Sequence, residues 1–285
     1  MKSKDDITRA EAIAANIYVH SFLARTGEYQ RSPHFRAENQ ERIRGILASL
    51  RARISSAGKT RMLDFGCGTG FVIALATPLF DEIHGVDITP DMMRQVDLSS
   101  GKVSLCEALA EQTPFVDGFF DFASAYSFMD HLFDYQEFLR EAYRVLKPGG
   151  ILYSDLNPNR DFIAAMVTAE AQARGLLSPL VMREIRGALH NGAHYEQSFG
   201  LIGEVLEMAE PIKSFDKGFD ASEVLATASA IGFSVCEVEY EWVLGPGGIL
   251  HEESAARVGS VDRYLRSVLP VSSALYKYLR FVFVK

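Results

Sequence analysis

The sequence predicts a doubly wound α/β fold with a seven-stranded, mainly parallel sheet, N-terminal helices and a helical insertion after the fifth strand. Strand-like and helix-like segments alternate from residue 61 to residue 156, which is typical of a parallel sheet with helices on both faces. Glycines follow the first of these strands directly, and an aspartate ends the second. Two long strand-like segments near residue 285 predict an antiparallel hairpin at one edge.

Two helices are expected before the alternation begins, over residues 7–25 and 37–53. In the second helix, apolar residues follow the spacing i, i+3, i+4 and i+7, which places them on one helix face. These residues are Ile43, Ile46, Leu47 and Leu50. The first helix ends near Gly27, and Ser32-Pro33 interrupts the chain between the two.

The alternating region and the C-terminal region supply the sheet. Strands are expected at residues 61–65, 82–88, 102–107, 120–126, 151–156, 233–244 and 278–284. Helices are expected at residues 71–76, from Pro90 onward, and at 135–146, 221–231 and 252–269. Residues 157–216 contain helical stretches and no clear strand, so this segment is interpreted as an insertion beside the sheet.

Composition excludes several classes of protein. The 285 residues carry a formal net charge of −8, which argues against a non-specific nucleic-acid binder. The N-terminus has charge but no apolar stretch of a secretory signal, and no run approaches the roughly 20 apolar residues that span a bilayer. Three cysteines without metal spacing fit a reducing cytoplasm. We therefore expect a cytoplasmic protein without metal, membrane or nucleic-acid partner, with a homodimer as its candidate assembly.

A glycine-rich turn follows the first strand and is the first candidate binding element. It reads Asp64-x-Gly66-x-Gly68-x-Gly70, with Cys67 between the glycines. Glycine permits a ligand to approach the free N–H groups of a strand-to-helix turn and tolerates the positive φ angles such a turn needs. The carboxylate of Asp64 can attract a cationic part of the ligand, whereas it would repel a pyrophosphate.

Asp87 at the end of the second strand is the second candidate binding element. A carboxylate in this position can accept hydrogen bonds from both hydroxyls of a ribose. Ile88 beside it can pack on an adenine face. A nicotinamide-dependent oxidoreductase would share this acid, but its glycine spacing is G-x-G-x-x-G, and Phe71 stands where its third glycine is expected.

Four motifs in order resemble the class I S-adenosylmethionine-dependent methyltransferases, close to the small-molecule and ubiquinone-type methylases. They lie at residues 63–70, 86–88, 114–121 and 144–150. The resemblance implies a Rossmann-like methyltransferase fold with S-adenosyl-L-methionine as cofactor. It implies that the glycine turn surrounds the methionine part, that Asp87 binds the ribose, and that Tyr126 and Ser127 face the sulfonium.

The adenine contact departs from the family pattern. Its two positions fall on Leu109 and Ala110, and Leu109 cannot accept the adenine amino protons. Either Glu107 or Glu111 takes that role, or the contact is missing.

Candidate acceptor residues follow the fourth and fifth strands and lie in the less regular segments. His131 is either a general base or a structural residue. Substrate contacts are expected from residues near the sheet edge, the insertion and the N-terminal region: Asp155, Asn157, His194, Tyr195, Tyr18 and Tyr29. Residues 1–36 and 157–216 are expected to flank the methyl group and to shape the acceptor pocket.

The function predicted from these observations is methyl transfer to the O, N or C atom of a small molecule. Transfer proceeds by in-line displacement, for which the protein must align the acceptor and exclude water. A methyltransferase acting on protein or RNA and a non-catalytic cofactor-binding protein remain alternatives. The expected units are an N-terminal helical cap (1–56), a cofactor-binding core (57–156), a helical lid (157–216) and the C-terminal part of the core (217–285).

Overall fold

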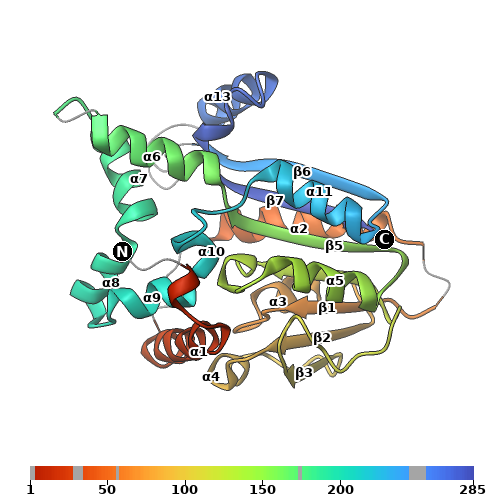
Figure 1. The fold of residues 1–285 in the computed structure, drawn as a ribbon. Helices are drawn as coiled ribbons and strands as arrows, with labels where there is room; N and C mark the ends of the chain where they lie inside the picture. The colour runs from red at the N-terminus through yellow and green to blue at the C-terminus, as the bar shows by residue number, and fades with distance from the viewer. Residues whose placement is uncertain (1–3, 28–34, 56–57, 173–174, 244–254) are drawn as a thin grey trace.

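The computed structural model describes residues 4–27, 35–55, 58–172, 175–243 and 255–285. A seven-stranded sheet forms the centre, in the order β3-β2-β1-β4-β5-β7-β6 (Figure 1). Its strands are β1 (Arg61–Phe65), β2 (Glu82–Asp87), β3 (Val103–Glu107), β4 (Phe120–Tyr126), β5 (Leu146–Pro158), β6 (Val235–Val243) and β7 (Tyr276–Val284). Strands β1 to β5 are parallel, and β7 runs antiparallel to both β5 and β6. The predicted fold class and the antiparallel hairpin are confirmed.

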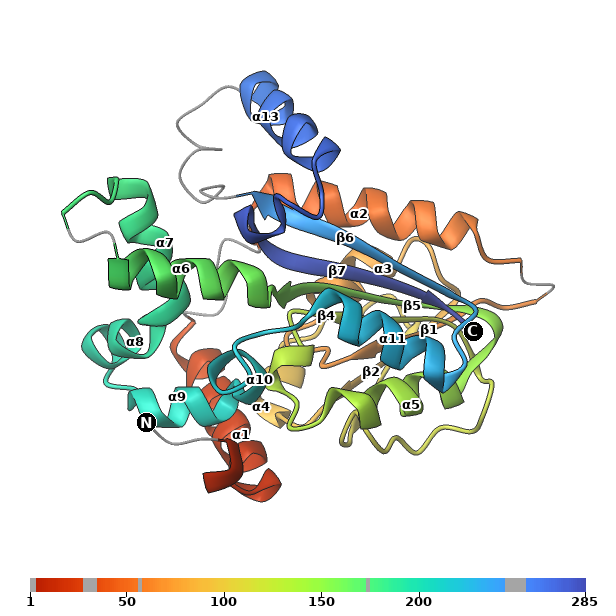
Figure 2. The same ribbon diagram turned by 45° about the horizontal axis from the view of Figure 1, so that its top comes forward.

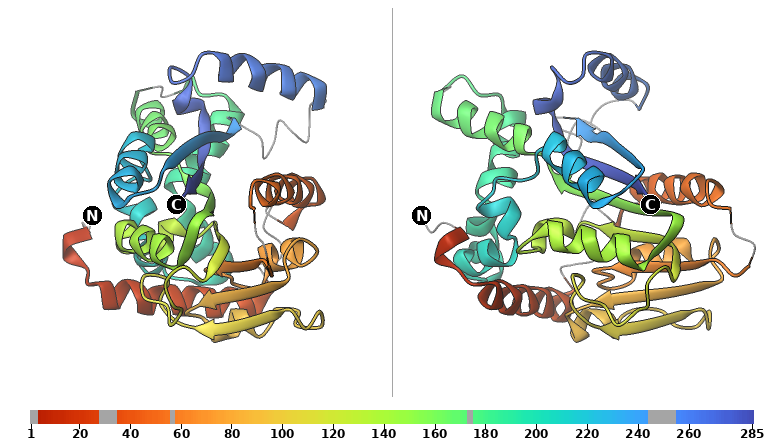
Figure 3. Two further views of the ribbon diagram at one scale, coloured as in Figure 1. Left: turned by 90° about the vertical axis from the view of Figure 1, so that its right-hand side faces the viewer. Right: turned by 45° about the vertical axis from the view of Figure 1, so that its right-hand side comes forward.

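The helices fall into a sheet-packing group and an edge group. The first group contains α2 (Ala37–Ala52), α3 (Phe71–Ala76), α5 (Tyr135–Val145) and α11 (Ala221–Ile231). The second contains α1 (Arg9–Thr26), α4 (Pro90–Met93), α6 (Arg160–Gln172), α7 (Pro179–Leu189), α8 (Asn191–Phe199), α9 (Gly203–Ala209) and α10 (Pro211–Ser214). In Figure 2 the helices α1 and α6 to α10 gather beyond one edge of the strands. α13 (Ala255–Ser267) and α1 lie at opposite ends of the molecule (Figure 3).

The side chains of each parallel strand alternate between two apolar cores. Met62 packs with α2 and α3 on one sheet face, whereas Leu63 packs with α5 and α11 on the other. Helix α2 buries Ile43 and Leu47 completely against the first of these faces, as its apolar stripe predicts. α2 and α3 thus cover one face of the sheet, and α5 and α11 cover the other.

The N-terminal region divides between the sheet face and the helical group at its edge. α1 begins with a capping box between Thr8 and Glu11 and ends at Gly27 in the left-handed conformation. Its residues Val19 and Leu23 pack against Leu206 of α9, away from the face that α2 covers. Within residues 1–56, α1 therefore belongs to the edge group of helices, and α2 packs on the sheet.

Strand β5 is longer than the predicted segment 151–156. It begins at Leu146, which pairs with Phe120, and continues to Pro158, which pairs with Tyr278 of β7. The extension beyond residue 156 arises because β7 pairs with Asn157 and Pro158 past the end of β4, whereas the extension before residue 151 begins at the pairing of Leu146 with Phe120. No described helix is long and apolar enough to cross a membrane.

Candidate functional site

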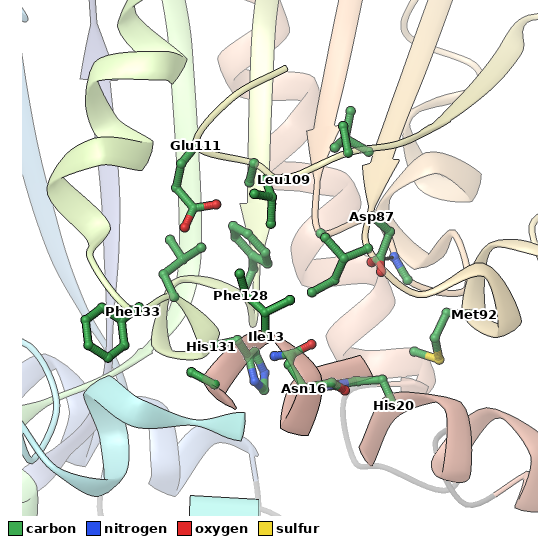
Figure 4. Close-up of a pocket in the computed structure, with 18 of the residues that line it drawn as sticks. Ile13, Asn16, His20, Asp87, Met92, Leu109, Glu111, Phe128, His131 and Phe133 are labelled. Carbon is green, nitrogen blue, oxygen red and sulfur yellow. Dashed lines mark hydrogen bonds between the residues drawn. The ribbon is translucent and has the colours of Figure 1, made fainter. Parts of the chain in front are cut away.

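Two cavities meet at the carboxyl ends of the parallel strands. The first lies under α1, between the loops that follow β1 to β4 (Figure 4). It is lined by Ala12, Ile13, Asn16, His20, Gly66, Gly68, Val86, Asp87, Ile88, Met92, Ala108, Leu109, Ala110, Glu111, Ser127, Phe128, His131, Leu132 and Phe133. Ligands of open α/β sheets bind at this edge because parallel strands end there together. We call this space the first cavity.

The glycine turn forms one wall of the first cavity. Gly66 and Gly68 line it with φ angles of 63° and 50°, and Gly70 has a φ of 83° where α3 begins. A side chain on Gly66 would collide with the ring of Phe128, because an added Cβ would lie 2.0 Å from its Cδ2 atom. Cys67 contributes only backbone to the turn, since its side chain packs in the core between α3 and the sheet.

Asp87 holds the glycine turn and the loop after β2 together. Its carboxylate accepts hydrogen bonds from the backbone N–H groups of Gly68 and Thr89, each at 2.8 Å. Burial raises the pKa of Asp87, while these two hydrogen bonds oppose the shift. The carboxylate thus reaches the first cavity at the predicted place, in an orientation set by the turn.

Asp64 lies beneath the glycine turn and is not among the residues that line the first cavity. Its side chain is 2% exposed and accepts a hydrogen bond from the Ser124 hydroxyl. Burial raises the pKa of Asp64 to about 7, and the neighbouring charge of Asp87 adds to the shift. Asp64 can therefore act on a cationic ligand only through its charge at longer range, and not through the predicted direct contact.

The raised pKa of Asp64 predicts a pH dependence of stability. The unfolded chain releases this proton near its usual pKa of 3.8, whereas the folded chain keeps it until about pH 7. Because the folded state binds more protons between these values, the contribution of Asp64 to the free energy of unfolding falls as the pH rises from about 4 to 7. Chemical denaturation measured at a series of pH values should show that the free energy of unfolding falls less steeply with pH in Asp64→Asn than in the native chain.

The control for this measurement is Asp97→Asn. The hydrogen bonds of Ser99 lower the pKa of Asp97, so its contribution to stability changes only below its usual value of 3.8. This variant should keep the slope of the native chain between pH 4 and 7. An unchanged slope in Asp64→Asn would show that Asp64 titrates normally.

The far end of the first cavity contains one acidic side chain. Leu109 and Ala110 line this end, as the family pattern places them, and Glu111 extends into the same space (Figure 4). Burial raises the pKa of Glu111, and its carboxylate lies 3.2 Å from the Arg9 guanidinium of α1. Glu107 is exposed and is not among the lining residues. Of the two alternatives, the geometry favours Glu111.

Tyr126 and Ser127 point in different directions at the end of β4. Ser127 lines the first cavity with a positive φ of 50°. Tyr126 turns to the opposite face, where its hydroxyl accepts a hydrogen bond from Asn39 of α2 at 2.8 Å and its ring lies beside Phe71. β4 ends at Tyr126, and the left-handed backbone of Ser127 turns the chain toward the cavity at this point. Tyr126 is not among the residues that line the first cavity, where it was expected.

The second cavity lies between the ends of β5 to β7 and the helices α6 to α10, with a volume of about 340 Å³. Ser127 and His131 line both cavities and form their common wall. The other lining residues are Asp130, Leu156, Pro158, Phe162, Ile163, Glu184, Gly187, Ala188, Tyr195, Glu210, Lys213, Trp242, Lys277 and Tyr278. This volume is in the range of cavities that hold small molecules.

The predicted acceptor residues separate into those that reach the second cavity and those that do not. Tyr195 of α8 lines it. The side chain of Tyr18 is 54% exposed and lines neither cavity. Tyr29 and the side chain of His194 lie outside the described part of the structure.

Asp155 and Asn157 lie inside the protein and line neither cavity. Asp155 pairs with Arg42 of α2 at 3.0 Å and accepts a hydrogen bond from the Tyr153 hydroxyl. The Asn157 amide donates to the carbonyl of Leu279 in β7. The predicted substrate contacts are replaced by structural ones, because β5 continues as a paired strand where the sequence predicts that it ends.

His131 is fixed from two sides at the wall between the cavities. Its Nδ1 lies 3.0 Å from the carbonyl oxygen of Ala209, which can only accept, so Nδ1 carries the hydrogen. The ring of His20 contacts it edge-on, with 4.8 Å between the ring centroids. Burial lowers the pKa of His20 to about 4, so this neighbour is uncharged at neutral pH. Nε2 of a neutral His131 is then a free acceptor.

Sequence reasoning expected the N-terminal region near the site but missed Asn16 and His20 of α1. Asn16 and His20 point from this helix into the first cavity (Figure 4), and the Asn16 amide donates to the same Ala209 carbonyl at 3.2 Å. Their i, i+4 spacing places both on one helix face. That spacing was the available signal, but it does not say which element the face meets.

Comparison with known proteins adds a family and a set of folds. Residues 63–154 match the family described as "Methyltransferase domain". A ubiquinone/menaquinone biosynthesis C-methyltransferase of Geobacter sp. (strain M21) is 37% identical over 107 residues, which cover 34% of this chain and 46% of the relative. A ubiquinone biosynthesis O-methyltransferase of Pseudomonas entomophila is 32% identical over 128 residues, 41% of this chain and 53% of the relative. The chain thus spans about half the length of the curated relatives it matches.

Solved structures resemble the whole architecture at low sequence identity. The YcgJ protein of Bacillus subtilis has a TM-score of 0.52 at 17% identity, with 86% of this chain and 98% of that chain covered. A SAM-dependent methyltransferase of Archaeoglobus fulgidus has a TM-score of 0.51 at 16% identity, with 86% and 94% covered. These similarities establish the fold alone.

Proposed function

We propose that this chain is a class I S-adenosylmethionine-dependent methyltransferase and that it methylates a small molecule bound in the second cavity. The observation that carries the proposal is the wall that Ser127 and His131 share between the two cavities. A methyl donor in the first cavity and an acceptor in the second would both lie beside these two residues. They can meet in line there, as displacement at a sulfonium requires.

The cofactor, S-adenosylmethionine, is assigned to the first cavity. We place its methionine part along Gly66 and Gly68, its ribose on Asp87, and its adenine between Ile88 and the segment Leu109 to Glu111. The cofactor supplies an activated methyl group and a neutral thioether leaving group. The chain's own residues bind it, align the acceptor and exclude water.

We do not infer the identity of the methyl acceptor from the curated relatives. The family match ends at residue 154, whereas most residues that line the second cavity come later in the chain. Of its lining, only Ser127, Asp130 and His131 fall inside the matched segment. The shape and charge of the acceptor site are therefore set mainly by the part of this chain that the relatives do not match.

Binding of the cofactor tests this assignment. We expect calorimetry to show micromolar binding of S-adenosylmethionine or S-adenosylhomocysteine, about −8 kcal/mol, and none of NADH. Asp87→Ala removes a charged acceptor of the ribose hydroxyls, and such hydrogen bonds contribute about 1.5–3 kcal/mol each, so affinity should fall by roughly tenfold or more. The variant also removes the acceptor of the Gly68 and Thr89 N–H groups, so thermal denaturation is measured together with affinity to separate loss of the ribose contact from loss of the turn.

Asp91→Ala is the matched control. This carboxylate lies four residues further along, pairs with Arg94 and is not among the residues that line the first cavity. It should leave cofactor affinity unchanged. Equal affinity of Asp87→Ala and the native protein, or preference for NADH, would contradict the assignment.

A further inference from the structure

The second cavity contains a buried carboxylate without a partner. Asp130 is 7% exposed, and its Oδ1 has no hydrogen-bond partner within the described part of the chain. Most buried polar atoms are satisfied, and an unpaired buried carboxylate is costly. Asp130 lines the second cavity, so a ligand bound there can supply the missing partner.

The charges of the second cavity leave one negative group unmatched. Its lining holds three carboxylates, of Asp130, Glu184 and Glu210, and two lysine ammonium groups. Lys277 pairs with Glu184 at 3.3 Å, and Lys213 pairs with Glu210 at 2.6 Å. Asp130 has no lysine ion pair of its own among the described residues, although the charge of Lys213 also acts on it and His131 lies 4.0 Å away. A cationic group on a ligand would complement this carboxylate.

Asp130 faces a second acceptor atom. Its Oδ1 lies 4.0 Å from Nε2 of His131, and in the neutral form of His131 that nitrogen carries a lone pair, since Nδ1 donates to Ala209. A ligand group with more than one hydrogen to donate can serve both acceptors. An ammonium group has several N–H bonds and can do so, whereas a hydroxyl has one hydrogen and leaves one acceptor unpaired.

We propose that the methyl acceptor is an amine, which binds as its ammonium form between Asp130 Oδ1 and His131 Nε2. The inference rests on the proposed function. One N–H bond breaks as its proton passes to Nε2, and the electron pair stays on nitrogen. This pair forms the new N–CH3 bond while the methyl–sulfur bond breaks and its electrons remain on sulfur. Asp130 stabilises the resulting imidazolium, and the product is a methylated ammonium and a thioether.

The surroundings of the pair support a cation of organic character. The rings of Tyr195 and Trp242 line the same cavity, and aromatic faces attract organic cations. A divalent metal is the other cation to consider, because the possible ligand atoms of Asp130, His131 and Glu210 lie within 4.8 Å of one another. Lys213 already places a positive charge on Glu210, which disfavours a metal there.

The test compares arylalkylamines such as phenethylamine with alcohols of the same skeleton. Calorimetry on the full-length protein saturated with S-adenosylhomocysteine should show the amines binding on the order of tenfold or more tightly. Asp130→Asn should remove this preference. His131→Gln should retain amine binding and lose methylation of the same amines. Asp97→Asn removes a surface carboxylate outside both cavities and should preserve the preference.

Several results would overturn the inference. These are equal or tighter binding of the alcohols to the native protein, no binding of any amine, or methylation of hydroxyls in place of amines. Zn²⁺ or Mn²⁺ binding that Asp130→Asn abolishes would also overturn it. The native comparison decides the question even if the Asp130 variant fails to fold. Absence of S-adenosylhomocysteine binding would instead contradict the proposed function.

Discussion

Gly66→Ala is expected to abolish measurable cofactor binding or reduce affinity by roughly two orders of magnitude. The residue has a φ of 63°, and its added Cβ would lie 2.0 Å from Phe128 Cδ2. The left-handed conformation costs about 1–2 kcal/mol for alanine, and overpacking adds about 1–3 kcal/mol. To relieve the overlap, the Phe128 ring or the turn must move, and both line the first cavity. Calorimetry with S-adenosylhomocysteine measures the loss.

Gly101→Ala separates backbone strain from collision. Gly101 has a φ of 68°, but an added Cβ there would meet no atom within 4 Å. This variant should lose about 1–2 kcal/mol of stability and keep its cofactor affinity. If both variants bound the cofactor equally well, the position of the glycine turn beside Phe128 would be wrong.

Arg42→Met is expected to lower the free energy of unfolding by about 3–5 kcal/mol, because it leaves the buried carboxylate of Asp155 without its cation, whereas Glu241 keeps its pair with Arg280 at 3.1 Å. The guanidinium of Arg42 lies 3.0 Å from Asp155, which is completely buried, and 3.4 Å from Glu241. Burial raises the pKa of Glu241, and the charges of Arg280 and Arg42 oppose that shift. Methionine keeps most of the apolar stem, so the loss reports the charge.

Arg53→Met is the control for this variant. It lies on the chain just after α2 and pairs with Glu237 of β6 at 3.1 Å, but both side chains are exposed. Exposed pairs contribute about 0–1 kcal/mol, so thermal and urea denaturation should be nearly unchanged. Similar losses in both variants would show that burial of the Arg42 network does not matter.

The elements with local determinants could be predicted from sequence. The glycine turn and Asp87 follow strands whose ends are marked in the sequence itself, and both occur at the first cavity. The strands β1 and β4 begin and end at the predicted residues, because apolar runs are bounded there by turn residues. These features depend on residues within a few positions of each other.

Side-chain direction at the strand ends was decided by pairing with distant segments. Tyr126 and Ser127 were both expected at the cofactor, yet strand alternation turns Tyr126 toward Asn39. Asp155 and Asn157 were expected at the acceptor, yet their partners on α2 and β7 draw them inward. The end of a strand predicted from local composition takes no account of pairing with a distant segment, and such pairing can extend the strand.

The sequence by itself determined the sheet, the methyltransferase motifs and the carboxyl edge at which ligands bind, since these depend on local periodicity and turn chemistry. Tertiary structure alone decided which helices close that edge. It placed His20 of α1 against His131 and brought Glu210 and Lys213 beside Asp130. Some of these residues lie more than 70 positions apart in the sequence. Their packing depends on the apolar contacts between α1 and α9. Binding of the cofactor follows from local signals, whereas choice of the acceptor follows from long-range packing.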